Sequence, residues 1–275
     1  MSLALFRVSL KLSQWAIVGW IAFLFLYGLF VVYVYPFASH AEGLQQFLKS
    51  LPEPMLRSFG LSQGAIDDLL REGGFTFNGW LVTRYFGLWP IILGIYAFTN
   101  GSGLVAREAE RGTIELLFSH PLPRHQLVTS KLAAFLTTLA LMVASSLAGI
   151  FVGSLFVEHV EVGWGSLLMT LVAGSMLVGA IMAYSTLLSC LVLDPRRTMA
   201  IAGGVMAASY ILNFLLPSLE SLAWMARLSL FYYYQPYDVL LHGGFPITGA
   251  LVYGGVTAVC LALAIVVFNR RKALL

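Results

Sequence analysis

The chain has 275 residues, of which 59% are hydrophobic and 11% are charged, and its formal net charge is +3. Soluble globular proteins carry about 25% charged residues, so this composition cannot cover the surface of a water-soluble domain. The mean hydropathy of +0.84 indicates that lipid is the solvent for most of the chain. A strongly basic surface that would bind nucleic acid is also excluded, because sixteen basic residues are nearly balanced by thirteen acidic ones.

Six stretches of the chain contain no Asp, Glu, Lys or Arg. They cover residues 12–41, 85–106, 132–157, 162–193, 198–219 and 239–269. A helix rises about 1.5 Å per residue, so even the shortest stretches, of 22 residues, can cross a hydrocarbon core of about 30 Å. They are apolar throughout rather than alternating, which argues against a β-barrel. The sequence therefore predicts an all-α polytopic membrane protein with six transmembrane helices, at approximately 15–36, 82–104, 132–156, 166–192, 198–219 and 247–268.

The basic residues predict how the helices are oriented. With the N-terminus inside, the inner segments hold eleven of the sixteen Lys and Arg residues. Cytoplasmic loops carry such an excess, so we predict that both termini are cytoplasmic and that the protein lies in the cytoplasmic (inner) membrane. The first apolar run is far longer than the apolar region of a signal peptide, about 7–15 residues, and is predicted to be a retained helix.

The segments between the helices do not amount to a second domain. Residues 1–14 are amphipathic and are expected to lie in the inner interface. Residues 40–81 are predicted to form an outer cap of short helices, and residues 105–131 form a charged cytoplasmic loop. The outer segment 220–245 is rich in aromatic residues, which prefer the headgroup level. It is either a short interfacial or re-entrant helix pair, or an aromatic belt with no specific role.

The inner loop after the second predicted span is the most highly charged part of the chain. Gly112 interrupts the helix that leaves the membrane, and Thr113 can cap a short helix with Glu115 in its first turn. Residues 116–118 (Leu-Leu-Phe) give this helix an apolar face, and Pro121 stops it. The product is a short, two-faced helix at the cytoplasmic interface. It can dock in a groove of a soluble partner or lie on the lipid surface, and the residues alone favour neither.

The loop and its flanks follow the pattern E-x-E-x-G-T-x-E-x-L-L-x-x-P-x-x-R, with the two leucines offset by one residue and Lys131 at the start of the third span. The matching residues are Glu108, Glu110, Gly112, Thr113, Glu115, Leu116, Leu117, Pro121 and Arg124. This pattern resembles the ABC-2 type of ABC transporter permease. Residues 228–234 (Leu-Ser-Leu-Phe-Tyr-Tyr-Tyr) are similar to a second element of that family, L-S-P-F-x-Y-Y, in which Leu230 replaces the proline.

The resemblance implies an ABC-2, type V exporter-like fold with a single permease domain, residues 1–275. Such permeases pair with separate cytoplasmic ATPase subunits through the loop residues above, and they export substrates between two six-span halves. We therefore expect two ATPase subunits, and a second permease copy or a paralogue. We expect no cofactor in this chain, with ATP and Mg²⁺ bound in the partner subunits. Residues 1–275 contain no G-x-x-x-x-G-K-[ST] motif, so the chain is not expected to be an enzyme.

Other functions are compatible with parts of the pattern. A non-transporting scaffold or sensor subunit of an ATPase complex would keep the docking loop. An ion-coupled secondary transporter would usually bury a carboxylate or lysine within the membrane, and the six charge-free stretches contain none. An intramembrane metalloprotease is disfavoured because no H-E-x-x-H occurs and the five histidines lack ligand spacing. We predict neither a catalytic residue nor a metal site.

The acidic residues of the loop have two sets of candidate partners. Glu108, Glu110 and Glu115 can pair with basic residues of an ATPase subunit, or locally with Arg107, Arg111 and Arg124. Exposed pairs contribute only about 0–1 kcal/mol each, and the local pairs are at least as favourable.

Small residues recur at four-residue spacing on the third predicted helix, at Ser145, Gly149 and Gly153. Small residues let membrane helices approach closely. They are predicted to serve helix packing, either within one subunit or between two permease copies.

The resemblance also implies that the second and fifth spans border the transport pathway. Asn100 in the second span and Ser209, Tyr210 and Asn213 in the fifth supply polar side chains there. They are candidate pathway residues, and hydrogen bonding between helices is their alternative role. Arg84 directly precedes the charge-free part of the second span. We expect Arg84 to lie at the outer end of this span and to act as an interface anchor.

Overall fold

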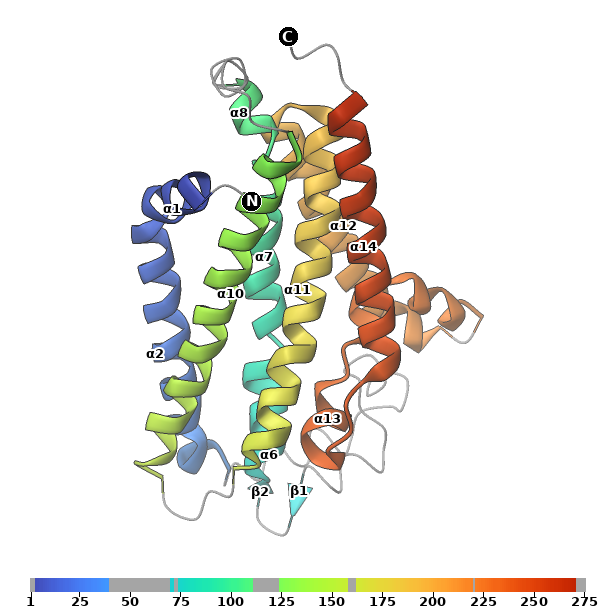
Figure 1. Ribbon diagram of the computed structural model, residues 1–275. Helices are drawn as coiled ribbons and strands as arrows, with labels where there is room; N and C mark the ends of the chain where they lie inside the picture. The colour runs from blue at the N-terminus through green and yellow to red at the C-terminus, as the bar shows by residue number, and fades with distance from the viewer. Residues whose placement is uncertain are drawn as a thin grey trace.

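The structure is a computed structural model that describes residues 3–39, 70–71, 74–110, 124–157, 162–219 and 221–270. Its long helices run side by side and form an elongated bundle (Figure 1). Six helical segments are long and apolar enough to cross a membrane: Gln14–Phe37, Phe77–Ser102, Gln126–Ser154, Trp164–Val192, Pro195–Leu215 and Ile247–Arg270. The prediction of an all-α protein with six transmembrane helices is therefore confirmed.

One side of the bundle is a close pair of helices that are far apart in the sequence. The elements involved are α1 (Leu3–Leu12), α2 (Gln14–Ser39) and α10 (Arg124–Ser154). The Oγ of Ser145 donates a hydrogen bond of 2.6 Å to the carbonyl of Ile21, and Gly149 lies directly against the backbone of Phe25. The two helix backbones approach this closely because α10 presents small residues to α2.

The second membrane span is interrupted by a π-helix in its first half. It consists of the α-helix α6 (Phe77–Leu81), the π-helix η1 (Val82–Phe86) and the α-helix α7 (Trp89–Ser102). In η1 the amide of Gly87 donates to the carbonyl of Val82, five residues back, at 2.9 Å. The α-helix resumes with Pro90 in its first turn, where a missing amide is tolerated. Single π turns of this kind are rare and occur frequently at functional sites.

A short antiparallel hairpin precedes α6. Its strands are β1 (Leu70–Arg71) and β2 (Gly74–Phe75), with Leu70 opposite Phe75. The sequence predicted only short helices in residues 40–81, since strands of two residues leave no alternating pattern to read. Residues 40–69 lie outside the described part of the chain.

α11 occupies the centre of the bundle (Figure 1). It spans Trp164–Val192 and packs against α7 and against α14 (Ile247–Arg270). Ser185 and Thr186 on α11 are fully buried, and their hydroxyls donate to the carbonyls of Ile181 and Met182, one turn earlier. These polar groups are satisfied within the helix itself, which keeps them compatible with an apolar core.

A tight turn connects α11 to α12 (Pro195–Leu215). Leu193 adopts the left-handed region with a φ of 57°, and Asp194 caps α12. One carboxylate oxygen of Asp194 accepts hydrogen bonds from the amides of Arg196 and Arg197, at 2.9 and 3.0 Å. Two of the otherwise unpartnered amides at the helix start are thereby satisfied.

We expect Asp194→Ala to lower the free energy of unfolding by about 1 kcal/mol, because the cap is lost and two amides lose their acceptor. In a protein of this size that corresponds to a decrease in Tm of about 2–4 °C. The measurement is thermal unfolding in detergent micelles. Asp194→Ser, which keeps a capping oxygen, should unfold close to the wild-type temperature, and an equal decrease in both variants would contradict the capping role.

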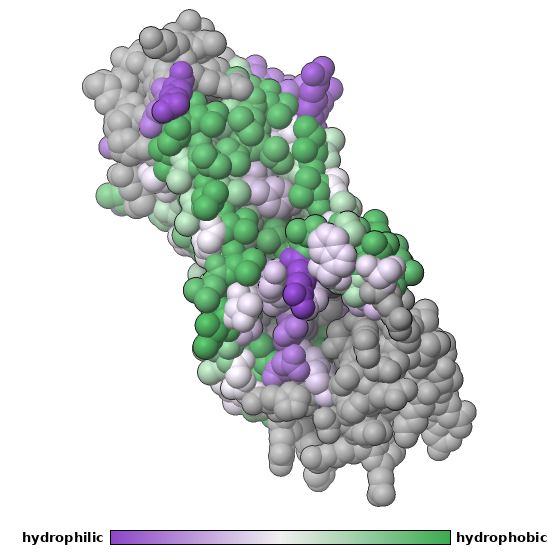
Figure 2. Space-filling model, turned by 90° about the vertical axis from the view of Figure 1, so that its right-hand side faces the viewer, coloured by the Kyte–Doolittle hydropathy of each residue, from purple (hydrophilic) through white to green (hydrophobic). Residues whose placement is uncertain are grey.

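Four short helices follow α12. They are η2 (Leu216–Ser218), η3 (Ala223–Leu228), η4 (Leu230–Tyr233) and α13 (Pro236–His242). The hydroxyls of Tyr234 and Tyr253 donate to the carbonyls of Phe86 and Leu230, at 3.3 and 3.0 Å. Phe231 is buried. Aromatic side chains thus hold this segment to η1 and α14. On the face in Figure 2, hydrophobic side chains cover most of the described surface, and a hydrophilic group interrupts them near the middle.

Candidate functional site

The two ends of the charged loop lie close together at one end of the bundle. The loop leaves the bundle through α8 (Ala106–Glu110) and re-enters it at Arg124, the first residue of α10. The predicted docking residues Gly112, Thr113, Glu115, Leu116, Leu117 and Pro121 lie outside the described residues. The described site is therefore the junction that joins this loop to the membrane helices.

An ion pair fastens α8 to α10. The Nζ of Lys131 lies 2.8 Å from a carboxylate oxygen of Glu108 and also donates a hydrogen bond of 2.8 Å to the carbonyl of Leu104. Both charged side chains are only about a fifth exposed, so water screens this pair less than a surface pair. The sequence had named three arginines as local partners of Glu108. The structure adds Lys131, which lies 23 residues further along the chain, as a partner of Glu108.

A buried hydroxyl fastens the start of α8 to α11. The Oγ of Ser189 accepts hydrogen bonds from the amides of Val105 and Ala106, at 3.1 and 3.0 Å. Ser189 is fully buried and lies 84 residues further along the chain than Val105. It supplies the acceptor that the first amides of a helix require. Sequence reasoning missed Ser189 because nothing in its local pattern separates it from the other hydroxyls of α11.

A third contact joins α8 to the end of α7. The Nη2 of Arg107 donates a hydrogen bond of 3.1 Å to the carbonyl of Thr99, and the Arg107 side chain folds over Gly103, where a Cβ would collide with it. A cation at the C-terminal end of a helix is favourable, because the last carbonyls carry a partial negative charge. Of the other predicted loop residues, Glu110 is exposed.

These contacts fasten α8 to the bundle at three points. Lys131, Ser189 and Arg107 tie it to α10, α11 and α7 respectively. A displacement applied to the 111–123 segment therefore reaches three membrane helices through one short element. Chemically the junction offers charge and hydrogen bonds. Among the described residues, no three His, Cys, Asp or Glu side chains are placed to hold a metal ion.

The candidate pathway residues do not form one cluster. The side-chain amide of Asn100 donates to the carbonyl of Tyr96 within α7, at 2.8 Å. A Cβ on Gly203 would contact Phe98, so Asn100 lies near the level of residue 201 on α12. Ser209 is eight residues further along α12, or roughly 12 Å at the helical rise. Asn100 and the group on α12 thus lie at different depths.

Two of the three polar residues of α12, Ser209 and Tyr210, contact the short helices that follow it. The carbonyl of Ser209 accepts a hydrogen bond of 2.7 Å from the Oγ of Ser229. The ring of Tyr210 meets that of Phe231 edge-on, with 5.4 Å between centroids. Asn213 is half-buried one turn later. Packing against η4 accounts for the contacts of Ser209 and Tyr210.

The small residues of α10 all pack within this one chain. Ser145 donates to Ile21, Gly149 meets the Phe25 carbonyl, and a Cβ on Gly153 would lie 2.8 Å from the Cβ of Val32. Every one of these partners belongs to α2. The described contacts therefore use this face for packing inside one subunit, which was one of the two roles considered.

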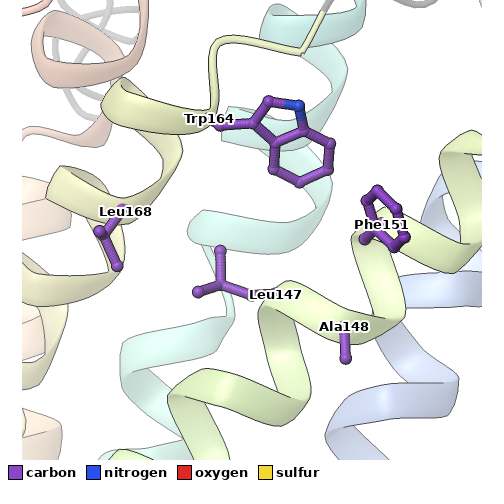
Figure 3. A pocket seen from close by; sticks show the side chains of 5 residues that line it. All are labelled: Leu147, Ala148, Phe151, Trp164 and Leu168. Carbon is purple, nitrogen blue, oxygen red and sulfur yellow. The ribbon is translucent and has the colours of Figure 1, made fainter.

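An apolar pocket of about 410 Å³ opens between α10 and α11. Figure 3 shows the five side chains that line it: Leu147, Ala148, Phe151, Trp164 and Leu168. The rings of Phe151 and Trp164 lie 5.5 Å apart. This lining suits an apolar group and provides no charge that could bind a polar substrate.

The family model described as "ABC-2 family transporter protein" matches residues 6–273, which is nearly the whole chain. The comparison with curated proteins finds no match. Together with six apolar helices long enough to span a membrane, the match identifies a multi-pass membrane protein. The chain belongs to the ABC-2 family of transporter proteins.

Proposed function

We propose that this protein is the permease subunit of an ATP-driven exporter. Separate cytoplasmic ATPase subunits, two in the complete transporter, would dock on the 107–124 loop, and a second copy of the permease or a paralogue would complete the pathway. The observation that carries this proposal is the α8 junction, in which Lys131, Ser189 and Arg107 connect the loop to three membrane helices. A loop that only lay on lipid would not need such a connection.

The mechanism follows from that connection. ATP would close the two ATPase subunits onto each other and displace the docked loop. Because α8 is fastened to α7, α10 and α11, the displacement would move these helices together and rock one permease half against the other. Coupling requires that the ATPase subunits interact differently with the two conformations, since a partner that binds both equally shifts no equilibrium.

Charge supports the proposed orientation. The end of the bundle that carries α8 also carries Arg196, Arg197 and Arg270, and it is the basic side of the chain. The positive-inside rule would place this end in the cytoplasm, where ATP-hydrolysing subunits can reach it. Figure 1 shows α1 and the C-terminal end of α14 toward the same end.

We expect Leu117→Asp to dissociate the ATPase subunit from this permease. Truncating or charging a central apolar contact typically weakens an interface by about 2 kcal/mol or more, which corresponds to about thirtyfold in Kd. The measurement is copurification of the two proteins in detergent, followed by ATP hydrolysis in the purified complex. Glu115→Arg, which reverses a charge on the same segment, should weaken the complex in the same direction.

The matched control is Leu219→Asp, because Leu219 is an exposed leucine that lies beyond the far end of α12. It should copurify with the ATPase at the wild-type level. Unchanged assembly and hydrolysis in Leu117→Asp and Glu115→Arg would refute docking through this loop. A complex that assembles and hydrolyses ATP but moves no substrate would favour a scaffold or sensor subunit over an exporter.

A further inference from the structure

The backbone of Arg84 lies well inside the membrane-spanning bundle. Its carbonyl accepts a hydrogen bond from the hydroxyl of Tyr27, and Tyr27 lies thirteen residues after Gln14 and twelve before Ser39, the ends of α2. At the helical rise, these separations correspond to roughly 20 and 18 Å. The helical span that contains Arg84 begins at Phe77. The helix therefore continues for seven residues on the Phe77 side of Arg84, and the guanidinium reaches back in that direction over Trp80.

The surroundings of the guanidinium hold it in place but leave it accessible. The Arg84 side chain is exposed, and its guanidinium carbon lies 5.3 Å from the centre of the Trp80 ring. The ring itself is fixed, because the Nε1 of Trp80 donates a hydrogen bond of 2.8 Å to the carbonyl of Val31. In the part of the chain that the structure describes, the carboxylate ion pairs use Lys131 and Arg197, and none involves Arg84.

An aromatic surface adjoins this cation. The ring of Tyr27 stacks on that of Tyr85 at 5.0 Å and on that of Phe23 at 6.0 Å, the latter pair within 3° of parallel. Phe23 is 47% exposed, whereas Tyr85 is buried. The stacked rings of Tyr27 and Phe23 thus form an apolar surface on α2 beside Arg84. A binding site for an amphipathic molecule needs two parts, a charge for the headgroup and an adjoining apolar surface for the chain.

We propose that Arg84 binds the anionic headgroup, a phosphate or carboxylate, of an amphiphile whose alkyl chain lies along Phe23 and Tyr27. Ionisable residues within a membrane face a partner charge or an aqueous cavity rather than bare lipid. The guanidinium fork matches the geometry of phosphate and carboxylate, and its ring-stacked face leaves the N–H edge free to donate. The amphiphile is either a resident anionic lipid or the cargo, and only its export rests on the proposed function.

The probe for the site is a dodecyl phosphate that carries a photoreactive diazirine on its chain. The full chain is reconstituted in nanodiscs of zwitterionic lipid, irradiated with the probe, and the labelled peptides are identified by mass spectrometry. We expect saturable labelling of the peptide that contains Phe23 and Tyr27. Arg84→Gln should reduce its apparent affinity about tenfold to a hundredfold, the range expected for one lost charge-assisted contact.

Two controls separate a specific site from partitioning into the bilayer. Arg227→Gln removes the same charge from another exposed arginine, on η3, and should label like the wild type. Arg84→Lys keeps the charge and should bind more tightly than Arg84→Gln. Diazirine analogues with a neutral or a cationic headgroup should label only at the background level. Equal labelling of wild type and Arg84→Gln, or equal labelling by all three headgroups, would overturn the proposal.

The source of the amphiphile is decided in two further arms. Nanodiscs containing phosphatidylglycerol should compete for labelling if the site holds a resident lipid. In the complex with its ATPase, dodecyl phosphate should stimulate ATP hydrolysis in an Arg84-dependent way if the site holds cargo. The labelling experiment needs no ATPase subunit. Failure of the headgroup site is therefore distinguishable from failure of the proposed transport function.

Discussion

Gly149→Ala is expected to destabilise the fold although it adds only one methyl group. A Cβ at this position would collide with the carbonyl oxygen of Phe25 and would lie 3.0 Å from its Cα. The obstacle is backbone, so a side-chain rotation cannot relieve it and α2 must move away from α10. Overpacking of this kind costs about 1–3 kcal/mol, which is a large part of a typical folding free energy of about 5–15 kcal/mol.

The matched control is Gly179→Ala on α11, where a Cβ would meet no atom within 4 Å. Because alanine is a better helix former than glycine by about 1 kcal/mol, this variant should be as stable as the wild type or more so. Both proteins are purified in the same detergent and their Tm values compared. If Gly149→Ala and Gly179→Ala unfolded at the same temperature, the close contact between α2 and α10 would be refuted.

Lys131→Met is expected to loosen α8 while leaving the docking loop itself intact. The substitution removes the ion pair with Glu108 and the hydrogen bond to Leu104, both at 2.8 Å. In the variant, the carboxylate of Glu108 no longer has the ammonium group of Lys131 beside it. Breaking a fully buried ion pair costs about 3–5 kcal/mol. Because each side chain of this pair is about a fifth exposed and is partly screened by water, we expect a smaller cost of about 1–2 kcal/mol. Local opening of residues 104–110 should then become about 5–30 times more frequent.

Hydrogen–deuterium exchange of residues 104–110 measures this opening without knowledge of the substrate. The control is Lys11→Met, the same change at an exposed lysine of α1, which should leave exchange at α8 unchanged. We expect Lys131→Met to copurify with the ATPase but to show weaker coupling between substrate and ATP hydrolysis. Wild-type exchange rates at α8 in Lys131→Met would contradict the role of the ion pair.

The number of spans was readable from the sequence because charge is excluded from hydrocarbon. Each of the six charge-free stretches contains, or extends into, one helix of the bundle. The cap of α12 was also readable in principle, since Asp194 precedes Pro195 and a predicted helix. Both features depend only on neighbours along the chain. The same holds for the family pattern around Glu108, whose matching positions all fall within seventeen residues.

The depth of Arg84 was not readable in the same way. The second span was predicted to begin near residue 82, which placed Arg84 at its outer end. The helix instead begins at Phe77, and a π turn, a ring stacked beneath the guanidinium and the Tyr27 hydroxyl accommodate the arginine within the bundle. Of these supports, only the Tyr27 hydroxyl comes from a distant part of the chain, 57 residues away. The predicted position of Arg84, at the outer end of the span, followed only from the charge of its side chain.

The sequence by itself determined the solvent of this protein, its six helices and its family, because hydropathy and short motifs are properties of consecutive residues. Only the tertiary structure decided that Lys131 pairs with Glu108, that Ser189 caps α8 and that Gly149 lies against Phe25. These contacts join residues that are 23 to more than 100 positions apart. Many apolar helices present equivalent serines and glycines, so packing selects the few that meet a partner.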